Sequence, residues 1–373
     1  MVDLMAKLKE YAALVNEAIE RYIPRSFDER YVRWACGEPR YAYDVETLTE
    51  AVAKPFWDLL DRGGKRWRPF LMMVVYEAIS GRDAREVLDF AIIPEVIHNG
   101  TLIVDDVEDD SELRRGKPCL HRIYGVDIAI NTGNTMYYLP LMVVLKSDKL
   151  DERTKLRIYE LYVQEMLRLS FGQAMDIAWH RGIRGAEVTE EQYLQMCAYK
   201  TGTLARFAAK LGAILARAED WQVESIGRFA EAVGVAFQIQ DDILNIAGDP
   251  EKYGKEWGGD ITEGKRTLMV IYTLRKADKA DRERLLQILD LHTRDLRLIR
   301  EAVSIMESYG AIDYARGVAR RLVEEAWSEV DGWLRPSEAK ETLEALARIL
   351  IEREFEGLEG QEAQGSQEYQ VQE

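Results

Sequence analysis

The spacing of apolar residues predicts a chain built almost entirely from α-helices. In many segments apolar residues recur at three- and four-residue intervals, which places them on one face of a helix. One such segment follows Thr293, a candidate N-cap residue, and stops at Gly310, a candidate helix end. Its stripe consists of Leu296, Ile299, Val303 and Met306.

A second stripe follows Pro336-Ser337 and consists of Leu343, Leu346 and Leu350. Breaks between such segments fall at Gly81, Gly116, Gly182 and Gly248. Strand-like alternation is not sustained anywhere, and residues 141–249 and 251–335 contain no proline. An all-β chain needs turn residues at frequent intervals, so the pattern predicts an all-α fold.

The chain shows no repeat period and no convincing linker before its last residues, so residues 1–355 are predicted to form one helical domain. Residues 356–373 hold five Gln, five Glu and three Gly with almost nothing apolar, which predicts a disordered tail. The segment 26–57 resembles nothing to which a function can be assigned.

Composition narrows the classes of function. A net charge of −16 argues against a general nucleic-acid binder. Apolar runs such as 70–76 are far shorter than the roughly 18 residues of a membrane span, and residues 1–10 lack a signal-peptide core, which predicts a cytoplasmic protein. Cys36, Cys119 and Cys197 are widely spaced, so buried apolar roles rather than disulfides are expected.

The most informative segment is an apolar run that leads into six acids among the eight residues 105–112. If the segment is helical, Asp105 and Asp109 lie one turn apart on one face, with Asp106 about 100° round. The more common interpretation of such a run is an acidic helix end that is exposed to solvent and binds nothing. Several carboxylates beside buried residues are nevertheless costly unless cations neutralise them.

A second cluster strengthens the metal interpretation. The run FQIQDDILN at 237–245 again places adjacent acids, Asp241 and Asp242, after apolar positions, with the oxygen-bearing Asn245 four residues after the first. Two such faces would form an all-oxygen cage, which Mg²⁺ prefers. No histidine or cysteine spacing typical of zinc sites is present.

Four short basic segments accompany the acidic clusters. They are GGKRWRP at 63–69, RRG at 114–116, KTG at 200–202 and GKRT at 264–267. Arginine suits bidentate phosphate contacts and lysine suits point-charge contacts. Each segment alone is typical of a basic surface, but together with two metal-type clusters they indicate two diphosphate ligands, one held through metal and one by cations alone.

These segments, together with DDVED at 105–109, GQAMD at 172–176 and GKEWGGDITEGKRT at 254–267, resemble the trans-isoprenyl diphosphate synthases of the polyprenyl synthetase family. They follow the family's order from about residue 60 to residue 270. One DDxxD motif is weakly specific, whereas this ordered set is highly specific. The resemblance implies the type I isoprenoid synthase fold, a single large all-α bundle around a deep central cavity.

The resemblance also implies roles for particular residues. It assigns several Mg²⁺ ions and the allylic diphosphate to Asp105, Asp106, Asp109, Asp241 and Asp242, with Asn245 as a neutral ligand where a third Asp is common. Residues matching those that hold isopentenyl diphosphate are Lys65, Arg68, His98 and Arg115. Residues matching those that hold the allylic diphosphate are Arg114, Lys200, Lys255 and Lys265. Thr201 and Gln238 match residues beside the developing positive charge.

His98 could instead have a purely structural role, since a lone histidine in an apolar helix is usually a core residue. It lies seven residues before Asp105, two turns back on nearly the same face, which favours the ligand role. The implied reaction ionises the allylic diphosphate with the help of Mg²⁺. Isopentenyl diphosphate then attacks the cation and loses a proton.

Product length is expected to depend on the helix before Asp105. Gly100 and Thr101 are too small to block a channel there, which disfavours a farnesyl product. Tyr137 and Tyr138 resemble the aromatic pair that closes the channel in eukaryotic-type geranylgeranyl synthases, although both suit an ordinary core. Ser170 stands where that type often has His. Geranylgeranyl diphosphate is predicted, with a longer or a farnesyl product as the alternative.

Three other functions compete with this interpretation. A class I terpene cyclase has no use for the second diphosphate site that Lys65, Arg68 and Arg115 would form. A noncatalytic subunit of a heteromeric synthase tends to lose aspartates, whereas both adjacent pairs are intact here. A helical interaction scaffold would leave the motifs unexplained. The family resemblance also implies a homodimer.

Overall fold

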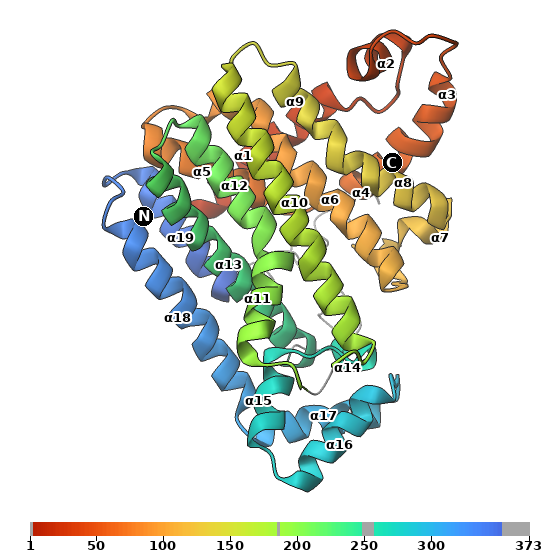
Figure 1. The fold of residues 1–373 in the computed structure, drawn as a ribbon, viewed down its shortest axis with the longest axis vertical. Coiled ribbons are helices and arrows are strands. Elements are labelled where there is room, and N and C mark those ends of the chain that lie inside the picture. Colours follow the sequence, from red (N-terminus) through yellow and green to blue (C-terminus); the bar gives the residue numbers. More distant parts are fainter. Residues whose placement is uncertain (1–2, 185–186, 248–256, 353–373) are drawn as a thin grey trace, which may run out of the picture. The chain divides into compact units, whose positions relative to one another are not determined.

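The computed structural model describes residues 3–184, 187–247 and 257–352, and most of them are helical (Figure 1). The all-α prediction is confirmed. The helices are α1 Leu4–Tyr22, α2 Glu29–Cys36, α3 Val45–Leu48, η1 Thr49–Ala53, α4 Lys54–Asp61, α5 Trp67–Ser80, η2 Ala84–Val87, α6 Leu88–Glu108, α7 Leu120–Tyr124, α8 Val126–Tyr138, η3 Leu139–Leu141, α9 Met142–Leu145, α10 Glu152–His180, α11 Glu190–Lys200, α12 Gly202–Leu215, α13 Asp220–Ala247, α14 Gly259–Glu263, α15 Leu268–Lys276, α16 Lys279–Asp290, α17 Leu296–Ser308, α18 Ala311–Asp331 and α19 Glu338–Glu352.

The chain forms two compact units. Unit 1 comprises residues 1–163 and 207–223, and unit 2 comprises residues 164–206 and 224–373. The helices α10, α12 and α13 each contribute residues to both units. The predicted boundary of the tail at residue 356 lies outside the described residues, as does the predicted break at Gly248.

The core of unit 1 contains α5 and α6, which pack against each other and against α1. In α5 every residue from Trp67 to Tyr76 is buried, so this helix is enclosed on all sides. Helix α6 crosses α8 at two glycines. A Cβ on Gly100 would lie 2.9 Å from the carbonyl oxygen of Gly133, and one on Gly133 would lie 2.6 Å from Cγ2 of Val104. This close crossing fixes α6 just before its acidic end.

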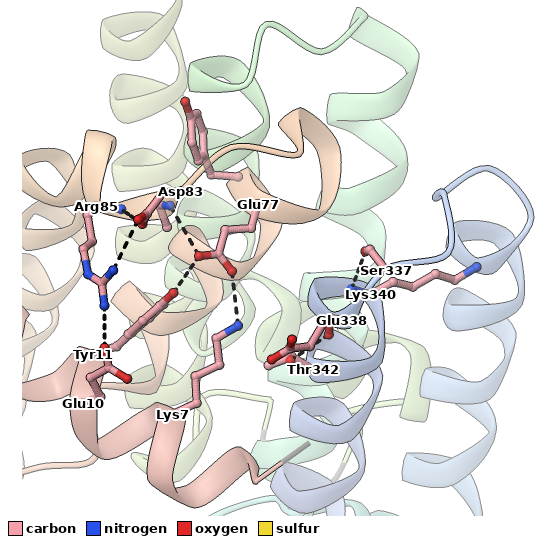
Figure 2. Close-up of polar contacts among 12 residues, drawn as sticks. Lys7, Glu10, Tyr11, Glu77, Asp83, Arg85, Ser337, Glu338, Lys340 and Thr342 are labelled. Carbon is pink, nitrogen blue, oxygen red and sulfur yellow. Dashed lines mark hydrogen bonds and ion pairs between the residues drawn. The ribbon is translucent and has the colours of Figure 1, made fainter. Parts of the chain in front are cut away.

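Helix α1 is attached to α5 by a half-buried carboxylate. Glu77 accepts hydrogen bonds from the Tyr11 hydroxyl at 2.6 Å and from Lys7 Nζ at 3.2 Å (Figure 2). Burial and the hydrogen bond to Glu77 raise the pKa of Tyr11. Arg85 also binds Glu10 of α1 at 2.6 Å. The N-terminal helix is therefore an integral part of unit 1.

In unit 2, glycines again allow backbones to meet near the KTG segment. A Cβ on Gly172 of α10 would lie 2.3 Å from the backbone nitrogen of Lys200. A Cβ on Gly234 of α13 would lie 2.8 Å from Cα of Gly202. Distances this short exclude any side chain, so α10 and α13 both approach the end of α11 closely.

Of the two helices predicted from apolar stripes near the C-terminus, one is confirmed and the other begins at a different residue. Helix α19 is confirmed: Leu343, Leu346 and Leu350 are buried, and Ser337 Oγ accepts the Lys340 N–H (Figure 2). Helix α17 does not begin at Thr293. Its N-cap is Asp295, which accepts the Arg297 N–H, and Leu296 is half exposed because it lies in the first turn. The prediction chose Thr293 and overlooked Asp295, which caps the helix in the structure.

The segment 28–48, between α1 and η1, contains no buried residue. Helix α2 has no buried residue, and its Tyr31 and Trp34 rings stack at 5.6 Å. Cys36 is exposed, so the predicted buried role is wrong for this residue because it ends α2, a helix that buries none of its residues, whereas Cys119 and Cys197 are buried as predicted. The stretch Ala84–Glu108 is apolar enough to span a membrane, but 72% of its most apolar window is buried, as in a core helix.

Candidate active site

The first aspartate motif occupies the end of α6. Asp105 and Asp109 lie one turn apart and are partly accessible, whereas Asp106 is buried. Arg114 Nε lies 3.1 Å from both carboxylate oxygens of Asp106, and its Nη2 lies 2.5 Å from Oδ1. The predicted metal ligand Asp106 is thus paired with the predicted phosphate ligand Arg114, an ion pair that sequence reasoning did not foresee.

A short hairpin presents the adjacent arginine. Strand β1 (Leu113–Arg114) pairs with β2 (Lys117–Pro118), a sheet too short to leave an alternating sequence pattern. Arg115 and Gly116 form the turn with φ values of +52° and +73°, as a two-residue type I′ hairpin requires. Arg62 Nη1 donates to the carbonyl of Pro118 at 2.8 Å and holds this hairpin against α4.

Arg115 belongs to a cluster of basic side chains in unit 1, the cation cluster, with Arg66, Arg68 and the neighbouring His98. The loop before α5 allows the arginines to approach, because a Cβ on Gly64 would lie 2.8 Å from Arg66 Nη1 and 3.1 Å from Arg115 Nη2. Arg66 itself has a φ of +53°. Arg68 stacks on the Trp67 ring at 4.4 Å, and its buried Nε has no hydrogen-bond partner within the described residues.

The pKa values show that this cluster holds more positive than negative charge. Burial lowers the pKa of Arg68 to about 10, with Arg115 acting in the same direction and Glu95 opposing. Burial and Arg66 lower the pKa of Arg115 to about 10. Burial, Arg68 and Arg115 hold the pKa of His98 well below its usual range, so His98 is neutral at pH 7. A multivalent anion at this site would relieve the repulsion.

In unit 2, the KTG segment joins the other motifs. Lys200 Nζ binds Asp176 at 2.6 Å. Thr201 donates to Gln238 Oε1 at 2.7 Å, and Gln238 Nε2 donates to Asp242 Oδ1 at 2.8 Å. This chain of bonds fixes the orientation of the Gln238 amide. The structure thereby brings Thr201 to Gln238 and Asp242, which lie one turn apart on α13, 37 or more residues later in the sequence.

Asp242 also accepts a hydrogen bond from Tyr193, whose hydroxyl lies 2.6 Å away and which is fully enclosed. Sequence reasoning missed Tyr193, because a tyrosine among ordinary helical residues gives no signal of its partner. Burial and the carboxylate of Asp260 raise the pKa of Asp242 to about 8, and Asp241 contributes less. Burial and the neighbouring carboxylates therefore disfavour the ionised form of Asp242, and the hydrogen bonds from Tyr193 and Gln238 offset this only in part.

The donor set fits a hard divalent cation. The acids of both motifs supply only oxygen atoms, the ligands that Mg²⁺ prefers. Among the described residues, no three His, Cys, Asp or Glu side chains already converge on one point. Asn245 is engaged elsewhere, because its Oδ1 accepts the Asp260 N–H at 3.1 Å and its carbonyl accepts that of Gly258 at 2.9 Å. The predicted ligand thus ties α13 to the start of α14.

The remaining predicted phosphate ligands are three lysines. Lys265 binds Glu263 at 2.8 Å and Asp260 at 3.6 Å in unit 2. Lys65 is half buried in the loop before α5. Lys255 lies outside the described residues. The first aspartate motif belongs to unit 1 and the second to unit 2, so their joint use in one active site is part of the proposal below.

The predicted chain-length residues separate into two groups. Gly100 and Tyr137 lie together in unit 1, because a Cβ on Gly100 would come 3.2 Å from Cε1 of Tyr137. Thr101 is half buried and donates its hydroxyl to the His98 carbonyl at 2.7 Å. Tyr138 is 67% exposed on the single chain, and Ser170 is exposed on α10. Tyr137 of α8 therefore adjoins the helix that leads to Asp105.

Comparison with known proteins identifies the class. The polyprenyl synthetase family model matches residues 49–306. The short chain isoprenyl diphosphate synthase of Methanothermobacter thermautotrophicus is 32% identical over 95% of this chain and all of that protein. The geranylgeranyl diphosphate synthase of Methanosarcina mazei is 33% identical over 83% of this chain and 92% of its own length.

A solved structure agrees. The geranylgeranyl pyrophosphate synthetase of Pyrococcus horikoshii has a TM-score of 0.80 and 33% identity, covering 94% of this chain and 99% of that one. The fold and the motifs define an all-α prenyltransferase. This chain belongs to the polyprenyl synthetase family, and its identification as a trans-isoprenyl diphosphate synthase is confirmed.

Proposed function

We propose that the chain condenses isopentenyl diphosphate with an allylic diphosphate and that its principal product is geranylgeranyl diphosphate. The observation that carries the substrate assignment is the cluster of Arg68, His98 and Arg115. Arg68 and Arg115 repel each other in the ligand-free protein, and His98 beside them is neutral. A diphosphate bound by cations alone accounts for that arrangement.

Asp105, Asp106, Asp109, Asp241 and Asp242 would hold Mg²⁺ at the allylic diphosphate. When bound, these ions neutralise the diphosphate and make it a good leaving group. Asn245 has a positioning role in this proposal, because its amide oxygen already accepts a backbone N–H.

The other side chains act by position and charge. Neutral His98 can donate a hydrogen bond to a phosphate oxygen without adding to the repulsion between the arginines. Lys200, Lys265 and Lys255 would grip the allylic diphosphate, with Arg114 recruited from Asp106. Thr201 and Gln238 keep oxygen lone pairs available for the positive charge that develops on the allylic carbon. Closure of the basic segments would exclude water from the cation.

The direct test uses the purified chain with radiolabelled isopentenyl diphosphate, Mg²⁺ and dimethylallyl, geranyl or farnesyl diphosphate. We expect elongated products with each primer and none without Mg²⁺. Hydrocarbon formed from geranylgeranyl diphosphate alone would indicate a terpene cyclase instead. Inactivity of the single chain with every primer would indicate a noncatalytic subunit.

Product length provides a separate prediction. Because Tyr137 adjoins Gly100, we expect Tyr137→Ala to open the channel and to lengthen the products by at least one isoprene unit. Tyr138→Ala is the matched control on the same helix. Its side chain is 67% exposed, so we expect little change from it alone. Chromatography of the dephosphorylated products measures both, and unchanged length in the double variant would refute the assignment.

A longer product is the second candidate, and one observation favours it. Neither Tyr138 nor Ser170 supplies a buried barrier on the single chain. The similar protein from Natronomonas pharaonis, 32% identical over 93% of this chain, is a geranylfarnesyl diphosphate synthase. The same chromatography distinguishes the two products in the unmodified protein.

We further propose a homodimer in the cytoplasm. Exposed apolar side chains recur at helical spacing along α8 and along α10, an arrangement that a second copy of the chain would cover. They are Val126, Ile130 and Tyr138 on α8 and Leu156, Val163, Leu167 and Phe171 on α10.

The dimer proposal predicts the effect of a charge on these faces. We expect Val163→Glu to convert a particle of twice the 42.9 kDa chain mass into monomers, measured by sedimentation equilibrium. Leu291→Glu, at a residue of similar exposure at the C-terminal end of α16, is the control and should leave the mass unchanged. A wild-type protein that sediments as a monomer would contradict the proposal.

A further inference from the structure

Helix α6 buries two polar residues that the reaction scheme does not use. Glu95 is 2% exposed and Asn99 is 0% exposed, and they lie one turn apart on the face that meets the cation cluster. Burying a carboxylate and an amide is costly unless both are fully hydrogen-bonded. Because burying Glu95 and Asn99 in an otherwise apolar helix is costly, we expect these two residues to have a function.

Their hydrogen bonds form a directed chain. Arg66 Nη1 donates to Glu95 Oε1 at 2.9 Å, and Asn99 Nδ2 donates to the same oxygen at 3.0 Å. Asn99 Nδ2 also donates to the Glu95 carbonyl at 2.9 Å. Because a carboxylate only accepts, Glu95 fixes which way the Asn99 amide faces.

The amide oxygen of Asn99 is thereby turned toward the hairpin. Arg115 Nη1 donates to Asn99 Oδ1 at 3.3 Å and to the Leu59 carbonyl at 3.1 Å. These two acceptors hold the guanidinium of Arg115. The backbone of Arg115 has a φ of +52°, set by the hairpin turn. Arg66 is meanwhile held by Asn16 Oδ1 at 2.9 Å and by the Leu60 carbonyl at 3.0 Å.

The chain of bonds also sets the balance of charge. Glu95 pairs directly with Arg66, whereas Arg68 and Arg115 feel it only as a more distant charge that opposes their lowered pKa values. One cation is thus neutralised and two are left to meet an incoming anion. A second carboxylate in direct contact with Arg115 would compete with a diphosphate, whereas the neutral Asn99 orients Arg115 without doing so.

We propose that Glu95 and Asn99 are positioning residues of the isopentenyl diphosphate site, with Glu95 orienting Asn99 and Asn99 orienting Arg115. Neither residue touches the substrate in this scheme. The inference rests on the proposed function, because it concerns the affinity of that same site.

The test is Asn99→Ala. Loss of a hydrogen bond to a charged donor predicts a rise of about tenfold or more in KM and Kd for isopentenyl diphosphate. We expect kcat to change by less than about threefold and KM for the allylic diphosphate to stay unchanged, because Arg115 contributes to one substrate only. Calorimetric titration of isopentenyl diphosphate provides a readout independent of turnover.

Two further variants separate orientation from folding. Thr132→Ala also deletes the hydrogen bond of a buried side chain in unit 1, from Thr132 Oγ1 to the Ala51 carbonyl at 3.0 Å, a bond that does not belong to the chain leading to Arg115. It should lower Tm without changing KM for isopentenyl diphosphate. Glu95→Gln keeps the acceptor oxygen that orients Asn99, so it should raise this KM less than Glu95→Leu does.

The outcomes distinguish the two proposals. If the unmodified chain elongates no primer, the proposed function fails. If it is active but Asn99→Ala raises both KM values equally, or lowers Tm with KM for isopentenyl diphosphate unchanged, the positioning proposal is overturned while the function stands.

Discussion

Replacing Asp105 or Asp241 by Ala is expected to reduce prenyl elongation by more than about a thousandfold. Each substitution removes a carboxylate that would hold Mg²⁺ at the leaving diphosphate, a contribution of several kcal/mol to the transition state. Single-turnover rates with a saturating allylic primer measure the effect. The magnesium concentration required for half-maximal activity should rise in both variants.

The acidic cluster contains its own control. Asp110 belongs to the same run of acids, but its side chain is 80% exposed and pairs with Arg122. It should therefore contribute little, and Asp110→Ala should keep its rate within about threefold. If Asp110→Ala and Asp105→Ala had equal effects, the loss would reflect the net charge of the cluster rather than a metal site.

The sequence predicts the buried face of a long helix better than it predicts the residue at which the helix begins. The stripe in α19 was predictable because three leucines on one face have no other way to become buried. The start of α17 was not, because Thr293 and Asp295 both suit an N-cap and only the local backbone selects Asp295. Cys36 is exposed because it lies in α2, a helix that buries none of its residues, and no local pattern reveals this.

The candidate site shows the same division. The aspartate and arginine motifs are recognisable because each is continuous in sequence. The partner of a motif is set by tertiary structure instead: Arg114 binds Asp106, Tyr193 binds Asp242, and Asn245 caps the backbone of α14. Glu95 and Asn99 look like isolated polar residues in a core helix until Arg66 pairs with Glu95 and the hairpin places Arg115 against Asn99.

The second large effect is expected at Arg68, where binding and stability should change in opposite directions. Arg68→Gln removes charge-assisted hydrogen bonds to the diphosphate, which predicts a loss of about a hundredfold or more in kcat/KM for isopentenyl diphosphate. The same substitution should stabilise the ligand-free protein. Burial lowers the pKa of Arg68 to about 10, so the charged form is disfavoured in the folded state.

The pH dependence follows from that lowered pKa. At pH 7 Arg68 is protonated in both the folded and the unfolded state, so its cost is fully present. The cost diminishes only as pH rises above the folded-state pKa of about 10. We therefore expect Arg68→Gln to raise Tm by a few degrees at pH 7, equivalent to about 1–2 kcal/mol. The gain should shrink toward pH 11.

Arg66 provides the matched control two residues earlier. It is as buried as Arg68 but binds Glu95 at 2.9 Å, so Arg66→Gln leaves a buried carboxylate without its partner. Breaking such a pair costs about 3–5 kcal/mol, which predicts a marked fall in Tm. Opposite shifts in Tm for two neighbouring arginines would show that charge at Arg68 is kept for binding. A fall in Tm for both variants would mean that Arg68 is an ordinary structural residue, and the assignment of the cation cluster to a diphosphate would lose its main support.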